Sequence, residues 1–186
     1  PSAINFLINF YQKNYLIYII LDNESDISKY IEKNLIPGKY DIIKPSNLIQ
    51  LCHLVEKIDF GIFMDSGPLH LAKLLNKKGV LIVTTVSHSV LLNKENLIVP
   101  VKNNFSSPYC YAPCGLTNIF NYEGKCGCFF SLKLKKNKLN EKVNLNSLQR
   151  GKLKDSYKSL MSNPVGCVKN INMKILFETI NSSIIK

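Results

Sequence analysis

Apolar positions along the chain follow two different spacings. In five segments they recur every three or four residues, which predicts one face of an amphipathic helix; these segments are residues 4–11, 25–34, 46–58, 68–76 and 172–184. Five shorter runs are almost continuously apolar and rich in β-branched and aromatic residues, which is typical of buried strands; they cover residues 15–21, 40–44, 59–64, 79–85 and 97–101.

From residue 4 to residue 101 these strands and helices alternate and are joined by short connections. Strict alternation of this kind predicts a Rossmann-like parallel sheet with helices on both faces. Ser46, directly after Pro45, is the predicted N-cap of the helix that follows. Ligands bind beyond the carboxyl ends of the strands in such sheets, so we expect the turns at 21–24, 65–70 and 84–88 to share one rim.

The composition changes after residue 101 and divides the chain into three predicted parts. Residues 1–101 form the Rossmann-like core. Residues 102–165 form an insertion, in which cysteines gather at 106–128 and lysines at 133–158. Residues 166–186 return to helical spacing and are expected to pack back on the core.

Composition narrows the classes of function. The 186 residues are 46% hydrophobic, which excludes a disordered or fibrous chain. The formal charge is +11, but Arg150 is the only arginine among the 24 basic residues. Because arginine supplies most bidentate phosphate and base contacts, we expect no specific nucleic-acid partner. A lysine-rich surface still favours anionic substrates or anionic lipids.

The ends and apolar runs of the chain predict its location. The longest clean apolar run, residues 15–21, is far shorter than the roughly 20 residues that a transmembrane helix needs. The chain begins at Pro1, without a methionine and without a basic-then-apolar leader, so we expect a preceding segment and no export signal. The prediction is a cytoplasmic protein, with peripheral association at the inner face of the cytoplasmic membrane as the alternative.

The stretch MDSGPLHLAKLL, residues 64–75, joins a predicted strand to a predicted helix. Gly67 permits close backbone approach, Pro68 suits a first helical position, and a helix start offers free N–H groups and a positive dipole end, which together favour an anion. Ser66 adds a hydroxyl, and His70 can donate to a phosphate oxygen. Asp65 would repel phosphate, so it is expected to accept from sugar hydroxyls or to order the turn.

An ordinary strand-to-helix turn with a surface histidine explains the same residues equally well. Neither a P-loop pattern GxxxxGK[ST] nor a GxGxxG pattern is present in the sequence.

The run from residue 46 to 83 resembles the donor-binding, carboxyl-terminal half of glycosyltransferase family 9, the lipopolysaccharide heptosyltransferase family. The resemblance lies in a Ser-Asn-Leu helix start, an Ile-Asp pair before a strand, and the pattern Asp-Ser-Gly-Pro-x-His-Leu-Ala from residue 65 to 72. It is looser over residues 5–34. It returns in the cysteines of 110–128 and in the GCVKNI stretch at 166–171.

The resemblance implies one half of a GT-B fold that holds a nucleotide-diphosphate sugar and transfers a heptose-like sugar to a cell-envelope glycan such as the lipopolysaccharide core. Ser66 and Gly67 would meet the diphosphate, Asp65 the sugar and His70 the phosphate neighbourhood. Asp26, or less convincingly Glu24, would hold the ribose. No cofactor is required, and the catalytic base would lie in an amino-terminal half, so this chain alone is expected to transfer nothing.

Two positions depart from the family pattern. A glycine is usual after the first strand, where this chain has Leu21 and Asp22, and a Gly-Pro-Thr-like loop is common after the fourth, where it has TTVSHS, residues 84–89. Thr85 and its neighbours could replace the lost donor contacts, or they could be loop residues without a ligand. The alternatives to a transferase half are a non-catalytic nucleotide-sugar-binding relic and another GT-B or epimerase-like enzyme.

The six cysteines fall into two groups. Cys52 lies on the apolar face of a predicted helix, where it is a small core residue. Four others, Cys110, Cys114, Cys126 and Cys128, are close in sequence, and Cys167 follows later. Their spacing is not that of a zinc knuckle, so reduced structural thiols are the first interpretation; a thiolate cluster for zinc or iron–sulfur, and disulfides, are the alternatives.

Overall fold

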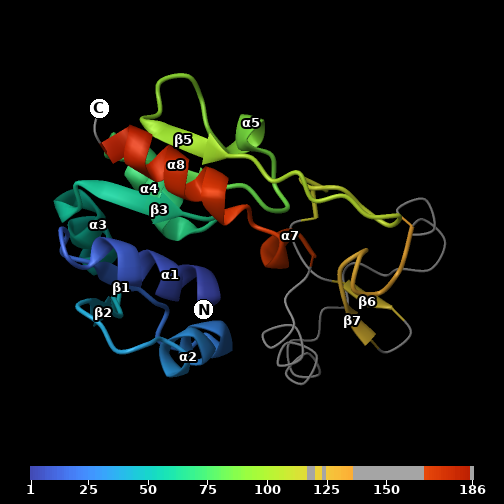
Figure 1. The fold of residues 1–186 in the computed structure, drawn as a ribbon, viewed down its shortest axis with the longest axis horizontal. Helices are drawn as coiled ribbons and strands as arrows, with labels where there is room; N and C mark the ends of the chain where they lie inside the picture. The colour runs from blue at the N-terminus through green and yellow to red at the C-terminus, as the bar shows by residue number, and fades with distance from the viewer. Residues whose placement is uncertain (117–119, 123–124, 136–165, 185–186) are drawn as a thin grey trace. The chain divides into compact units, whose positions relative to one another are not determined.

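The computed structural model describes the backbone of residues 1–116, 120–122, 125–135 and 166–184, and the side chains of these ranges except 120–122 and 125–126 (Figure 1). The chain separates into two compact units, Pro1–Lys57 and Ile58–Lys186, and each contains its own parallel sheet. The predicted division at residues 101 and 165 stays a prediction, because residues 136–165 lie outside the described ranges.

The first unit is a two-stranded parallel sheet with three helices. Its elements are α1 (Ser2–Tyr11), β1 (Tyr18–Ile20), α2 (Asp26–Lys33), β2 (Asp41–Ile43) and α3 (Leu48–Lys57). In the sheet, Tyr18 lies opposite Asp41 and Ile20 opposite Ile43. Ile8 of α1 packs with Ile19 and Leu21 in a buried cluster. Burial of these aliphatic side chains stabilises the unit by about 1.5–3 kcal/mol each.

Side chains of α1 also hold the chain that follows α2. The amide of Asn5 donates from Nδ2 to the carbonyl of Asn34 at 2.9 Å, and its Oδ1 accepts from the N–H of Ile36 at 3.1 Å. About two helical turns later, directly after α1, Gln12 Oε1 accepts from the N–H of Lys39 at 2.8 Å. These contacts satisfy backbone groups that belong to no helix or strand.

The start of α3 corrects one prediction. Leu48 is its first residue, and the side chain of Asn47, not of Ser46, accepts from the N–H of Gln50 at 2.9 Å. Ser46 instead donates its backbone N–H to Gln50 Oε1 at 2.9 Å. The two bonds resemble a capping box displaced by one residue, and Asn caps a helix as well as Ser does.

The second unit contains a three-stranded parallel sheet of order β3-β4-β5, built from β3 (Phe60–Phe63), β4 (Lys78–Ile82) and β5 (Ile98–Val101). Helix α4 (Gly67–Leu74) connects β3 to β4, and the short helix α5 (His88–Leu91) lies between β4 and β5. Gly61 lies opposite Gly79 in the register. A Cβ on Gly61 would overlap the ring of Phe63, and one on Gly79 would overlap the carbonyl of Gly61. The two glycines therefore allow the aromatic ring to lie against the paired backbones.

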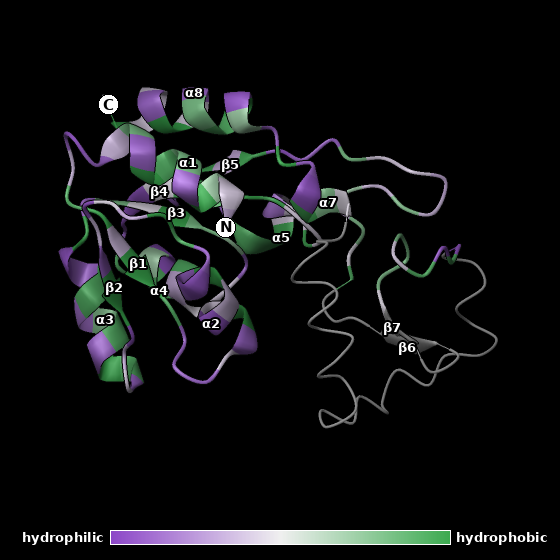
Figure 2. Cartoon of the chain, turned by 60° about the horizontal axis from the view of Figure 1, so that its bottom comes forward, coloured by the Kyte–Doolittle hydropathy of each residue, from purple (hydrophilic) through white to green (hydrophobic). Residues whose placement is uncertain are grey.

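The terminal helix α8 (Met173–Ile184) packs against β4 and β5. Leu176 and Ile180 are fully buried, whereas Lys174 and Glu178 are exposed. Figure 2 shows the corresponding change from hydrophobic to hydrophilic residues around this helix. With Val80 and Leu81 of β4, which are also fully buried, these side chains form the core of the second unit.

The remaining described elements are short. Strands β6 (Phe120–Tyr122) and β7 (Lys125–Gly127) pair antiparallel, and α7 (Gly166–Lys169) precedes α8. Among the residues whose structure is described, no helix has the length and apolar character needed to cross a bilayer. The mixed α/β class with parallel strands is confirmed, but strands β1 to β5 pair in two parallel sheets rather than one. Apolar periodicity identifies strands without fixing which of them share hydrogen bonds.

Candidate functional site

The turn between β3 and α4 contains five of the predicted donor-binding residues. Ser66 precedes the helix with extended backbone angles, φ −164° and ψ 167°. Its hydroxyl donates to the carbonyl of Met64 at 3.1 Å, so it does not cap the helix. Its carbonyl accepts from the N–H groups of Leu69, at 3.1 Å, and His70, at 3.4 Å. The turn is thus ordered by its own backbone.

Because of these bonds, fewer backbone N–H groups are free to bind an anion than the sequence predicts. The first helical residue is Gly67 rather than Pro68, which has no N–H, and the N–H groups of Leu69 and His70 are already used. The N–H of Gly67 donates to no oxygen of the described residues. A Cβ placed on Gly67 would meet nothing within 4 Å, so the backbone faces open space. The free Gly67 amide at the positive end of the helix therefore remains for an anion.

The side chains of Asp65 and His70 approach each other at this turn. Asp65 Oδ1 is 3.8 Å from His70 Nε2, and the two side chains are 37% and 55% exposed. The contact is an ion pair only when His70 is protonated. The turn therefore combines a carboxylate that accepts from hydroxyl groups, an imidazole that donates to oxyanions, and an open glycine amide.

Thr85, also predicted as a donor contact, lies after β4 and makes a different set of contacts. Its carbonyl accepts from the N–H of Gly115 at 2.7 Å, and the residue lines a cavity that contains cysteines. The predicted loop 84–89 includes the start of α5, because the hydroxyl of Ser87 accepts from the N–H of Ser89 at 3.3 Å and His88 is already helical. β3 and β4 are parallel neighbours, so Thr85 and Asp65 follow the same edge of the sheet.

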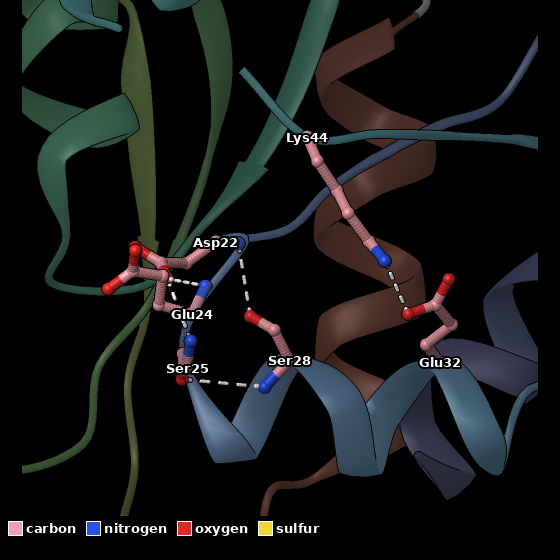
Figure 3. A network of polar contacts seen from close by, with 6 residues as sticks. All are labelled: Asp22, Glu24, Ser25, Ser28, Glu32 and Lys44. Carbon is pink, nitrogen blue, oxygen red and sulfur yellow. Dashed lines mark hydrogen bonds and ion pairs between the residues drawn. The ribbon is translucent and has the colours of Figure 1, made fainter. Parts of the chain in front are cut away.

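Asp26 belongs to the first unit, where it is the exposed first residue of α2. The carboxylate that orders this region is Asp22, whose Oδ1 accepts from the N–H groups of Glu24 and Ser25, each at 2.8 Å (Figure 3). The N–H of Asp22 donates to Ser28 Oγ at 3.0 Å. Sequence reasoning missed this role of Asp22, although an Asp three residues before a helix cap is a usual signal for such a turn.

A hollow of about 250 Å³ in the first unit was not predicted at all. It lies where the chain passes from β2 to α3, and polar and basic side chains line it, among them Lys44, Gln50, His53 and Lys57. Lys44 Nζ is 2.6 Å from Glu32 Oε2, so its charge is already paired (Figure 3). No spacing in the sequence links β2 to this face of α3.

Four cysteines line a smaller cavity of about 20 Å³ in the second unit: Cys110, Cys114, Cys128 and Cys167. All four are free thiols, and the side chain of Cys126, predicted to belong to this group, lies outside the described residues. Burial, followed by the proximity of the other three thiols, raises the pKa of Cys167 to about 11. The pKa of Cys110 is raised by burial too, partly offset by a hydrogen bond with Ser107.

The described side chains include no group of three His, Cys, Asp or Glu residues already arranged to hold a metal ion. Searches against family models, curated proteins and solved structures found no match to this chain.

Proposed function

We propose that this chain is the donor-binding half of a glycosyltransferase that moves a heptose-like sugar from a nucleotide-diphosphate sugar to a cell-envelope glycan such as the lipopolysaccharide core. The observation that carries the proposal is the turn of residues 64–70, in which the free Gly67 amide lies at a helix start beside the Asp65 and His70 side chains. The order of residues in this turn is the part of the sequence that resembles glycosyltransferase family 9.

In the proposed mechanism the turn stabilises the departing nucleotide diphosphate. As the bond to the sugar breaks, negative charge grows on the phosphate oxygen, and the Gly67 N–H, the α4 dipole and a protonated His70 all favour that charge. The Asp65 carboxylate accepts a hydrogen bond from a hydroxyl group of the donor sugar and orients the His70 ring. The base that takes the proton of the acceptor hydroxyl belongs to an amino-terminal half, and the reaction requires no cofactor.

The same proposal names the partners and the location. The donor sugar, a glycan or glycolipid acceptor and the amino-terminal half are the partners, and the enzyme acts on the cytoplasmic side of the membrane. The net charge of +11 favours an anionic donor and an anionic membrane surface.

A panel of ADP-, UDP- and GDP-sugars in a thermal-shift assay tests donor binding. A ligand at ten times its Kd stabilises the folded chain by about 1.4 kcal/mol, which is a measurable increase in Tm. His70→Gln removes the imidazole donor and should weaken binding by roughly 10- to 100-fold. Asp65→Asn should weaken binding of the sugar nucleotide more than binding of the free nucleotide diphosphate.

His53→Gln is the matched control, because His53 is an exposed helical histidine, 3.5 Å from Glu56, in the other unit. It should bind the panel like the wild type. Equal shifts in the wild type, His70→Gln and Asp65→Asn would remove the proposed site. Sugar transfer by the 186-residue chain alone would overturn the placement of the base elsewhere.

A non-catalytic nucleotide-sugar-binding relic is the second candidate. It is favoured by Thr85, whose carbonyl is bonded to Gly115 and which faces the cysteine cavity, so that the loop after β4 offers fewer donor contacts. Transfer of labelled sugar after joining the chain to an amino-terminal half distinguishes the two, since a relic binds the donor without turnover. Selective binding of a donor outside the heptose class would instead favour another GT-B or epimerase-like enzyme.

A further inference from the structure

We infer that Cys110, Cys114, Cys128 and Cys167 form a structural zinc site. Cys110 and Cys114 come from the segment after β5, Cys128 directly follows β7, and Cys167 is the second residue of α7. Three segments separated in sequence thus bring four thiols to one cavity. Four cysteines around one small volume match the most common all-thiolate zinc sites.

Hydrogen bonds hold the backbone of three of these cysteines. Ser107 Oγ accepts from the N–H of Cys110 and donates to its carbonyl, both at 3.0 Å. Ser131 Oγ accepts from the N–H of Cys128 at 2.8 Å. Asn103, which is only 8% exposed, donates from Nδ2 to the carbonyl of Cys167 at 2.6 Å. Outer contacts of this kind are what orient ligands around a metal.

The fourth cysteine is fixed through its neighbour. The N–H of Gly115, directly after Cys114, donates to the carbonyl of Thr85 at 2.7 Å, which joins this loop to the end of β4. The backbone that carries each of the four thiols is therefore held in place, and rotation about its Cα–Cβ bond moves the sulfur atom toward or away from the cavity. The described thiols are not arranged as ligands, so metal binding requires their sulfur atoms to move closer together.

The size and lining of the cavity select the kind of guest. A volume of about 20 Å³ admits one water-sized guest, so a single ion fits, whereas an iron–sulfur cluster is too large. Aromatic rings, including Phe105, Phe129 and Phe130, cover it, and the described residues that line it include no histidine or carboxylate. A donor set made only of thiols in an apolar shell favours zinc over the harder Mg²⁺ or Ca²⁺.

Among the described residues around the cavity, few apolar side chains are buried. In the cluster nearest the cysteines only Phe129 and Leu134 are buried, with Cys110, Leu116 and Leu132 partly buried around them. Two buried side chains contribute on the order of 3–6 kcal/mol, less than the entropy lost by ordering a segment of this length. Small units of this kind are commonly stabilised by a metal, since zinc binding contributes directly to folding.

The test is the zinc content of the reduced full chain, purified without chelator from zinc-supplied cells. The inference predicts one zinc ion per chain in the wild type and in Cys52→Ser, and loss of zinc in Cys114→Ser and Cys167→Ser. Cys52 is the matched control because it lies in α3 of the first unit. Cys126→Ser should retain zinc; loss from Cys126→Ser with retention in Cys167→Ser would overturn the assignment of the four ligands.

If the cysteine variants fail to fold, the inference can still be tested on the wild-type chain. Chelator-stripped wild-type chain is titrated with Co²⁺, and an intense thiolate-to-cobalt absorption that saturates at one ion per chain is expected. Alkylation followed by mass spectrometry should then show Cys110, Cys114, Cys128 and Cys167 protected by zinc and Cys52 modified. Absence of zinc from the wild type together with absence of the cobalt band, or bound iron with inorganic sulfide, would overturn the inference.

Discussion

Asn103 offers a direct test of how the cysteine segment is attached to the sheet. The side chain is 8% exposed; it donates to the Cys167 carbonyl at 2.6 Å and accepts from the N–H of Phe105 at 3.0 Å. Asn103→Ala removes both partners at once and leaves a buried carbonyl and a partly buried N–H without a protein contact. Each unpaired group costs about 1–3 kcal/mol, so the free energy of unfolding should fall by about 2–6 kcal/mol.

Urea unfolding of the reduced chain measures this loss. With a slope of about 2 kcal/mol per M, the midpoint should move down by about 1–3 M. Asn103→Asp keeps the acceptor for Phe105 but turns a carboxylate toward the Cys167 carbonyl, so it should be at least as destabilising as alanine.

Asn93→Ala is the matched control for Asn103→Ala. Asn93 Oδ1 also accepts two backbone N–H groups, those of Glu95 and Asn96, each at 3.1 Å, but it is exposed to water. Water replaces the lost bonds there, so the expected cost is about 0.5 kcal/mol or less. If Asn103→Ala and Asn93→Ala have the same midpoint, the Asn103 contacts do not hold α7 and the reasoning from burial is refuted.

Three further predictions follow from glycine packing and from one buried phenol. Gly79→Ala should lower the free energy of unfolding by about 1–3 kcal/mol because the new methyl overlaps the Gly61 carbonyl, whereas Gly67→Ala, which faces open space, should change it by less than about 0.5 kcal/mol; equal urea midpoints would contradict this. Gly67→Ala should nevertheless weaken binding of a nucleotide diphosphate, measured by calorimetry, because the methyl separates the phosphate from the amide; unchanged affinity would exclude the close approach. Burial, followed by the charge of Tyr15, raises the pKa of Tyr11 to about 12. The folded state therefore keeps this phenol neutral, and its contribution to stability is complete below pH 10 and is lost as pH rises toward 12. Tyr11→Phe should remove the corresponding decrease in the urea midpoint over this pH range, and Tyr18→Phe should not.

Local patterns predicted most elements of the described structure, and their errors have identifiable causes. The run 15–21 was assigned to one strand, but β1 begins at Tyr18; Tyr15 and Leu16 lie outside the ladder, and Leu16 is 86% exposed. Apolar content alone cannot show that these side chains face water. The cap of α3 was misplaced by one residue because Ser46 and Asn47 are both good caps.

The candidate sites depended on different amounts of sequence information. The turn at Asp65 to His70 is contiguous, so its residues could be predicted together and only the use of each N–H required the structure. The cysteine cavity combines Cys110 with Cys167 across a long separation, which spacing within 110–128 could not indicate. The same holds for the contact of Thr85 with Gly115, which depends on how the segment after β5 returns to the end of β4.

The hydrogen bond from Asn103 to the carbonyl of Cys167 also joins the two ends of the long segment between these residues. The two residues are 64 positions apart; Asn103 lies just after β5, and Cys167 lies in α7, just before α8, which packs against β5. Closing a flexible loop costs only about 0.6 kcal/mol more for each doubling of its length. Doubling or halving the length of this segment therefore changes the free energy of loop closure by less than the Asn103 hydrogen bonds contribute. This bond fixes where the chain leaves β5 and where it returns to α8, so the segment between them can change in length without displacing the sheet.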